Sequence, residues 1–160
     1  MSRKRRGTNG SPKRTHVSRA CHEIALNSSE YRTSLALREE VLRKPLGLVW
    51  TAEELAKEKA SVHVGCFRDD ELVGALVLTP EDVTTVRMRL VAVAPMHQGQ
   101  GVGSALVACA EDVAKRLGYR RMVARARETA VPFYRKHGYG VEDETFVQVG
   151  LPHRAVWKEL

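Results

Sequence analysis

Three alternating glycines, Gly99, Gly101 and Gly103, come shortly after an apolar segment that ends at Pro95. Because glycine carries no side chain, backbone N–H groups at these positions can crowd around an anion. A long helix is expected to begin at Gly101, and the free N–H groups and positive dipole end of a helix start favour a phosphate there. The spacing therefore predicts a phosphate-binding turn between a strand and a helix. The alternative is a tight turn that binds nothing.

Two common nucleotide-binding loops do not fit this spacing. A Walker A loop needs Gly-Lys-Ser/Thr, which is absent here. A dinucleotide fingerprint needs a third glycine where this chain has Ser104. The following strand also ends in Arg125 and Arg127, without the acid that would bind a ribose. We therefore expect neither a P-loop nor a Rossmann domain.

The elements that position the turn follow from hydrophobic periodicity and from start and stop signals. Ser28 or Ser29 can cap the first helix, and Thr51 with Glu54 forms a capping-box pattern at the second. Helices are predicted over residues 28–43, 52–59, 101–117 and 130–137, and strands over 20–26, 62–68, 71–78, 83–94, 121–126, 141–149 and 154–158. This order predicts an α/β fold with a mixed sheet and helices on both faces. On the third helix Leu117 is expected to face the core.

The net charge of +7 is concentrated at one end of the chain. Residues 1–19 hold seven basic residues and no acid; removing them leaves 19 basic residues against 19 acidic ones. We expect a disordered basic tail over 1–19 and one folded domain over 20–160. The tail could touch nucleic acid or a membrane electrostatically, or be a solvated extension. The neutral body argues against a nucleic-acid-binding protein, and neither a specific nucleic-acid partner nor a membrane is expected.

The three cysteines, Cys21, Cys66 and Cys109, are widely separated and none belongs to a C-x-x-C pair. This pattern favours free thiols that fill the core, with no disulfide and no metal site. It also favours a cytoplasmic location. No apolar run approaches the ~20 residues that span a bilayer.

Two segments resemble the signatures of the GNAT acetyltransferases. Gln98–Gly103 matches the pattern Q/R-x-x-G-x-G/A, and the Val-Ala-Val-Ala-Pro before it resembles the fourth strand of that family. Ala130–Tyr139 matches the second signature, A-x-x-F-Y-x-x-x-G-F/Y. Val149–His153 is similar to an ElaA-like branch. The two signatures occur in the right order, so together they are more specific than either alone.

The resemblance implies a GNAT fold, with a mostly antiparallel sheet of six to seven strands that splays between the fourth and fifth. It also implies acetyl-CoA as co-substrate, no metal, and acetyl transfer to a primary amine of a small molecule or peptide. The residues expected to bind the cofactor are Val91, Ala92, Val93, Gln98, Gly99, Gln100, Gly101, Val102, Gly103, Ser104 and Phe133. Many relatives carry Asn where this chain has Arg127, which either faces a phosphate or does not contact the ligand.

Tyr134 matches the general acid of the family, which protonates the departing thiolate. The alternative is a core aromatic beside Phe133. A backbone N–H near Val93 is expected to stabilise the oxyanion. Glu128 and His153 lead the candidates for the base that removes a proton from the amine. Each could equally be structural.

The weaker base candidates are His63 and Glu144. Glu144 ends an acidic run, residues 142–144, which is either a solvated surface or attracts a cationic amine. A non-catalytic acyl-CoA sensor on the same fold is the alternative function, against which Tyr134 argues. A homodimer is one expected assembly; the sequence does not name the acceptor.

Overall fold

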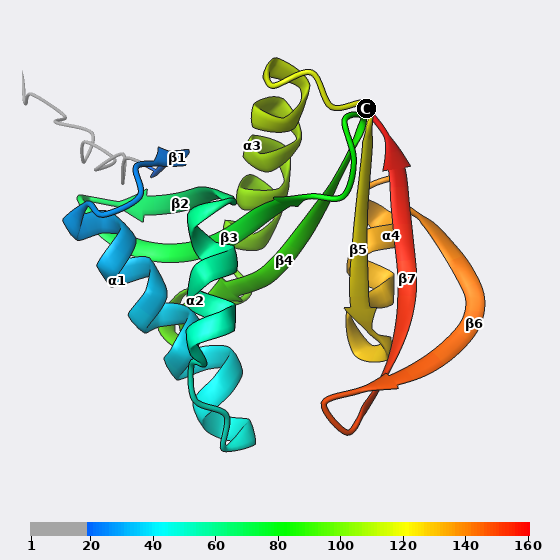
Figure 1. The fold of residues 1–160 in the computed structure, drawn as a ribbon, viewed down its shortest axis with the longest axis horizontal. Helices are drawn as coiled ribbons and strands as arrows, with labels where there is room; N and C mark the ends of the chain where they lie inside the picture. The colour runs from blue at the N-terminus through cyan, green and yellow to red at the C-terminus, as the bar shows by residue number, and fades with distance from the viewer. Residues whose placement is uncertain (1–18) are drawn as a thin grey trace, which may run out of the picture.

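Residues 19–160, which the computed structural model describes, form a seven-stranded sheet in the order β1-β2-β3-β4-β5-β7-β6 (Figure 1). The strands are β1 (Arg19–Ile24), β2 (Val62–Arg68), β3 (Glu71–Pro80), β4 (Thr85–Val93), β5 (Arg121–Arg127), β6 (Gly140–Gln148) and β7 (Leu151–Glu159). The α-helices are α1 (Ser29–Arg38), α2 (Ala52–Lys59), α3 (Val102–Arg116) and α4 (Val131–Lys136). The predicted disordered tail lies outside the described residues, except that its last residue, Arg19, already begins β1.

Helices cover both faces of the sheet, as predicted (Figure 1). The main core cluster joins the apolar sides of α3 and α4 to one face, including Leu76 and Leu78 of β3. Val77, between them, points to the opposite face, since side chains alternate along a strand. There α1 packs against β3 and β4. α4 covers one face of β5, β7 and β6, and the opposite face of these three strands, beside α1, carries no helix.

The expected splay between the fourth and fifth strands is confirmed. β4 and β5 are parallel and pair only from Thr85–Met88 with Arg121–Ala124. Beyond these residues the two strands diverge, as the lower half of Figure 1 shows. All other neighbouring strands are antiparallel. Past Met88 and Ala124 the facing backbone edges of β4 and β5 have no strand partner.

A bulge in β4 lies just past the last paired residue. Ala75 of β3 pairs with Ala92 and Val77 pairs with Arg89, so β4 carries one residue more than β3 over this interval. Leu90 within it has φ of +52°, which is unusual for a residue with a side chain. The bulge turns the end of β4 away from β5 and contributes to the splay.

The first helix differs from the prediction beyond Arg38. The α-helix ends there, and Glu39–Arg43 forms a π-helical turn. Arg38 and Arg43 both lie over the Trp50 ring, at 5.5 and 4.2 Å from its centroid. Residues five apart share a face only where the helix closes i→i+5 bonds, so the π turn allows both guanidinium groups to reach one indole.

Leu117 is also placed differently from the prediction. It is 48% exposed, because α3 ends at Arg116 and Gly118 then turns the chain at φ of +92°. Leu117 therefore occupies the C-cap of the helix and does not reach the core. No helix within residues 19–160 is long and apolar enough to cross a bilayer.

The prediction of free thiols is wrong for two of the three cysteines. Cys21 of β1 and Cys66 of β2 are register partners and form a disulfide, while Cys109 is free. They are 45 residues apart in the sequence, and only the pairing of β1 with β2 brings them together. The expected cytoplasmic location rested on free thiols and loses that support; it stays a prediction.

Candidate active site

The start of α3 has unpaired backbone donors. Ser28 and Thr51 cap α1 and α2 with side-chain oxygens, whereas Gly101 precedes α3 and provides no side-chain cap. Gly99 and Gly101 have φ of +75° and +81°, values that glycine adopts without strain. A Cβ placed on Gly99 would meet nothing within 4 Å. The first N–H groups of α3 therefore lack a side-chain cap and can donate hydrogen bonds to an anion.

Side chains brace this turn from within. The Gln98 side-chain amide donates to the Val93 carbonyl at 3.2 Å, and that of Gln100 donates to the Met96 carbonyl at 3.3 Å. Arg68, at the end of β2, donates to Oε1 of Gln100 at 2.8 Å. Arg68 was not singled out from the sequence because only the fold brings β2 to the turn. It places a positive charge next to the candidate phosphate site.

The first turn of α3 contacts α4, so the two signature segments meet. A Cβ on Gly103 would lie 3.6 Å from the Phe133 ring and 3.9 Å from Val93. Ser104 Oγ and His137 Nε2 are hydrogen-bonded at 2.9 Å. The structure thus brings the end of β4, the glycine turn and Phe133 to one place, at the open side of the splay.

Tyr134 follows Phe133 on α4 and is almost fully buried. Its ring packs edge-on against Phe133 and Tyr139, with centroids 5.3 Å away in each case. Burial raises the pKa of Tyr134 to about 12, so the phenol keeps its proton at neutral pH. Among the described residues its hydroxyl has no hydrogen-bond partner, although Tyr139 donates to Glu111. Tyr134 packs like a core aromatic but holds an available proton.

His153 lies on β7 opposite Arg127, at the end of β5 and beside the splay. Its ring stacks on Phe146, with centroids 5.9 Å apart, and its Nδ1 lies 2.8 Å from the Leu151 carbonyl. A carbonyl can only accept, so Nδ1 carries the proton in the neutral ring and the lone pair is on Nε2. His153 can therefore accept a proton through Nε2.

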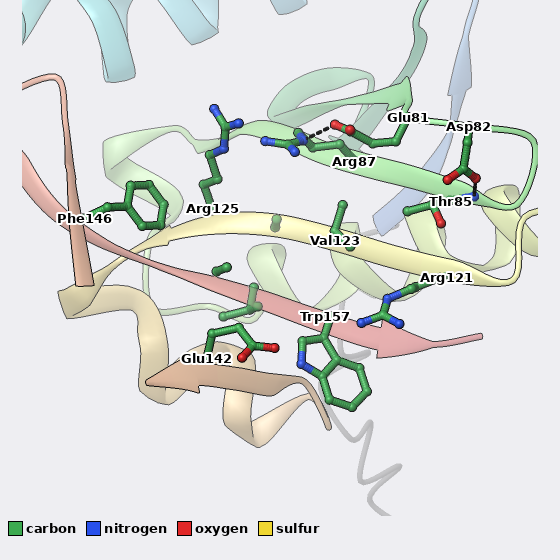
Figure 2. Close-up of a pocket in the computed structure, with 13 residues that line it drawn as sticks. Glu81, Asp82, Thr85, Arg87, Arg121, Val123, Arg125, Glu142, Phe146 and Trp157 are labelled. Atoms are coloured by element: carbon green, nitrogen blue, oxygen red, sulfur yellow. Dashed lines mark hydrogen bonds and ion pairs between the residues drawn. The ribbon is translucent and has the colours of Figure 1, made fainter. Parts of the chain in front are cut away.

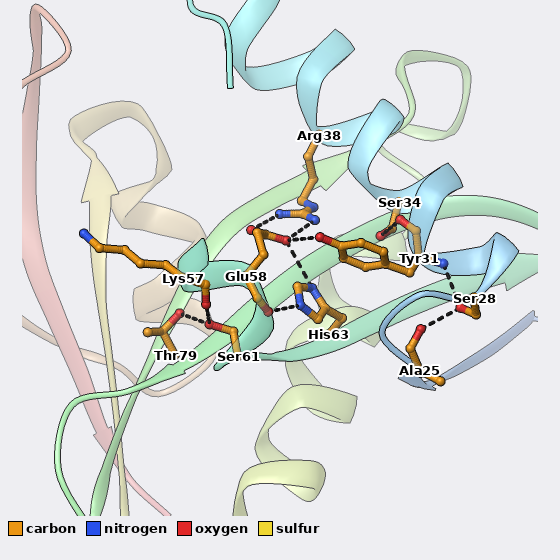
Figure 3. Close-up of polar contacts among 10 residues, drawn as sticks. All are labelled: Ala25, Ser28, Tyr31, Ser34, Arg38, Lys57, Glu58, Ser61, His63 and Thr79. Carbon is orange, nitrogen blue, oxygen red and sulfur yellow. Dashed lines mark hydrogen bonds and ion pairs between the residues drawn. The ribbon is translucent and has the colours of Figure 1, made fainter. Parts of the chain in front are cut away.

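The remaining base candidates are placed less favourably. The Glu128 carboxylate, just past β5, lies 3.8 Å from the guanidinium of Arg154. Glu144 is exposed on β6, the outermost strand. His63 lies on β2 under α2, in a separate buried network (Figure 3). Of the four, His153 is held in a defined orientation beside the splay.

The network around His63 is centred on Glu58 (Figure 3). Arg38 donates to both carboxylate oxygens at 2.9 and 2.8 Å, and Tyr31 donates at 3.1 Å. Burial opposes the charge on Glu58, but hydrogen bonding and the charge of Arg38 bring its pKa below the ordinary value. His63 Nε2 binds the Glu58 carbonyl oxygen at 2.9 Å, and burial lowers the pKa of this imidazole. These contacts tie α1, α2 and β2 together, which is a structural role.

An arginine cluster, Arg87 and Arg89 of β4 with Arg125 of β5, lies on the sheet face away from α3 and α4. Figure 2 shows Arg125 beside Arg87, which is ion-paired with Glu81. Arg87 and Arg125 of this cluster border a hollow of about 370 Å³ over β4, β5, β7 and β6. Arginines alternate with other residues along both strands, a pattern visible in the sequence. Only the β4–β5 pairing shows that the two rows adjoin.

Comparison with known proteins places these features in context. Residues 24–139 match the model of the acetyltransferase (GNAT) family. The uncharacterized N-acetyltransferase YjcF of Bacillus subtilis is 29% identical over 137 residues, which cover 85% of this chain and 97% of that protein.

Solved structures share the fold at low identity. Escherichia coli ElaA matches with a TM-score of 0.74 and 19% identity, covering 89% of this chain and 100% of that one. A GNAT family acetyltransferase from Elizabethkingia anophelis with acetyl-CoA bound matches with a TM-score of 0.70 and 19% identity, over 89% and 98% of the two chains.

Proposed function

The chain belongs to the acetyltransferase (GNAT) family, and we propose that it transfers an acetyl group from acetyl-CoA to a primary amine of a small molecule or peptide. The observation that carries this proposal is the uncapped start of α3, which lies beside α4, the helix that bears the buried Tyr134. An anion site and a protonated acid, both at the open side of a strand splay, are what this reaction needs.

The residues at the splay fit coenzyme A. The backbone N–H groups of residues 99–104 would bind the pyrophosphate, with Arg68 adding charge. The unpaired edge of β4 at Val91–Val93 would bond the amide-bearing pantetheine arm as an added strand does. Phe133 would pack beside it. Arg127 is in register with His153, on the face away from α4, so it does not reach the phosphates in this arrangement.

Acetyl-CoA supplies a thioester whose carbonyl carbon a neutral amine attacks and whose thiolate then leaves. Tyr134 protonates that thiolate from its hydroxyl. A backbone N–H near Val93 donates to the oxyanion. His153 Nε2 takes the proton of the amine directly or through one water; Glu128 is the second candidate.

The proposal is tested by thiol release from acetyl-CoA with a panel of amino acids, polyamines, aminoglycosides and peptides, alongside calorimetry with CoA. Acceptor-dependent release supports an enzyme. Tight CoA binding without release for any amine would instead indicate an acyl-CoA sensor. Absence of CoA binding would overturn both.

Replacing Gly101 tests the anion site directly. We expect Gly101→Val to weaken CoA binding at least tenfold, because a side chain at φ of +81° distorts the turn and lost hydrogen bonds to a charged group contribute ~1.5–3 kcal/mol. Gly118→Val is the matched control, since Gly118 ends the same helix at φ of +92° in open space. Both variants should lose similar stability, and equal CoA affinities in calorimetry would contradict the site.

A further inference from the structure

We propose that the acceptor amine carries an anionic group, a carboxylate or a phosphate, which the arginine cluster binds; this rests on the proposed function. The pairing register of β4 and β5 shows where the arginine cluster lies. Met88 and Ala124 are the last paired residues of β4 and β5, and Arg89 and Arg125 come next on each strand. Both side chains alternate away from the buried Met88 and Ala124, and so away from α3 and the cofactor site. The cluster therefore lies at the apex of the splay, on the face from which an acceptor reaches the thioester.

The charge of the cluster is largely unbalanced. Arg87 pairs with Glu81, but no described carboxylate lies within ion-pair distance of Arg89 or Arg125. Desolvation, and then the charges of Arg87 and Arg89, lower the pKa of Arg125, with Glu81 opposing them. Like charges held together in a fold are destabilising unless an opposite charge joins them. A bound anion would supply it.

The surface around Arg125 can hold a small molecule. Arg125 and Phe146 line the hollow of about 370 Å³ shown in Figure 2. They also line an adjoining hollow of about 510 Å³, together with Val147 and Gln148 at the end of β6. Phe146 provides an apolar wall, and Gln148 Oε1 lies 3.5 Å from the Arg125 guanidinium. Together the two hollows provide the volume range of a small-molecule site.

The acidic groups of these hollows do not offset the cluster. Glu81 is used by Arg87, and Asp82 accepts backbone N–H groups of Thr84 and Thr85 at 2.8 and 2.7 Å. Glu142 lies at the Trp157 end (Figure 2). The predicted attraction of a cationic amine to residues 142–144 therefore finds no counterpart at the splay apex. A polyamine would be repelled there.

The same charges assist the chemistry. A positive neighbour disfavours the ammonium form of an amine, so the cluster lowers the pKa of a nearby acceptor nitrogen. More of the amine is then neutral and able to attack. The arginines would bind such an acceptor through its anion and favour its neutral amine, and the proton itself goes to His153 or Glu128.

The first test measures anion binding without relying on turnover. Inorganic phosphate is titrated by calorimetry into protein saturated with CoA, so that the pyrophosphate turn is filled. We expect phosphate to bind, and Arg125→Gln to weaken that binding about tenfold or more. Arg120→Gln, an exposed arginine on the α3–β5 connection, makes the same charge change and should have no effect. Absence of phosphate binding excludes a phosphate group and leaves only a carboxylate for the second test, and equal phosphate binding in both variants overturns the proposal.

The second test distinguishes carboxylate from phosphate with matched acceptors: glycine against glycinamide, phosphoethanolamine against ethanolamine, and spermidine as a polycation. The preferred anion should lower KM about tenfold or more relative to its neutral partner, and Arg125→Gln should remove that difference. Transfer to glycinamide, ethanolamine or spermidine at equal or better efficiency overturns the anion proposal and leaves the acetyltransferase intact. Lack of CoA binding overturns the proposed function instead.

Discussion

At the scale of single residues, burial would raise the pKa of the proposed acid, Tyr134, and also the pKa of the thiol that leaves. Tyr134, with its pKa at about 12, is a weaker acid than an exposed phenol. A thiolate leaving group in the same apolar surroundings is also harder to keep charged, so its affinity for a proton rises too. The two shifts compensate, and in the proposed reaction the phenol would stay protonated until the thiolate forms.

Tyr134→Phe keeps the ring and removes only the proton donor. We expect kcat to fall ~10²–10⁴-fold, with CoA affinity and thermal stability nearly unchanged. Tyr139→Phe is the matched control, because it removes a neighbouring phenol whose hydroxyl is bonded to Glu111. If chemistry limits turnover and the Tyr134 variant stays within about threefold of the parent, well below the general-acid range, the residue is only a core aromatic.

His63 makes stability depend on pH. Its pKa is lowered by burial, against the raising influence of Glu58, so the folded state binds fewer protons than the unfolded one. Stability should therefore fall as pH drops below the ordinary value of 6.5, by at most about 1.4 kcal/mol per pH unit. Denaturation between pH 7 and 5 should show a shallower loss in His63→Gln. The exposed His22→Gln should retain the parental slope.

Residues that act through local geometry could be predicted from the sequence. The caps Ser28 and Thr51 and the positive-φ glycine turn depend on neighbours within a few positions. The arginine cluster depends on which strands pair, and hydrophobic patterns do not specify this. For the same reason the sequence offers both His63 and His153 as candidate bases, although one lies in a buried network and the other beside the splay.

At the scale of elements, β1 is held to the sheet from one side only. It is an edge strand paired with β2, and the Cys21–Cys66 disulfide joins the two covalently. Cross-linking closes a segment of 45 residues that includes α1 and α2. The bond therefore restricts the unfolded chain as well as attaching the strand.

Cys21→Ser should lower the free energy of unfolding by about 2–4 kcal/mol, the range expected for a loop of this length. Denaturant titrations with and without a reductant check this: the parent should lose stability on reduction and the variant should not respond. Cys109→Ser, which removes the free thiol, should behave like the parent. A parent protein insensitive to reductant would show that this cross-link adds nothing to stability.

At the scale of the whole molecule, equal numbers of acids and bases conceal their separation in space. The part of the chain after residue 19 is neutral by count, yet arginines gather on β4 and β5 while residues 142–144 are acidic and exposed on β6. The count of charged residues excludes an excess of positive charge in the folded domain, but it does not show that one face of the sheet is basic. Only a folded arrangement gives such a protein a polarised surface.

All residues of the proposed site lie within residues 19–160. We therefore expect that deletion of residues 1–16 leaves kcat and KM within about twofold of the parent, well under the effect of losing a catalytic group. Steady-state thiol release by the truncated protein checks this. A well-folded truncation that loses most of its turnover would make the basic segment part of the site.

β6 is the edge strand at one side of the sheet. An outermost strand offers unpaired backbone groups to any strand of another molecule. Here its register with β7 is interrupted between Val141 and Thr145, and the interruption coincides with the exposed acids of residues 142–144. Irregular backbone and like charges both oppose the addition of a further strand. The β6 edge therefore disfavours aggregation through strand pairing. A homodimer would have to form through another surface.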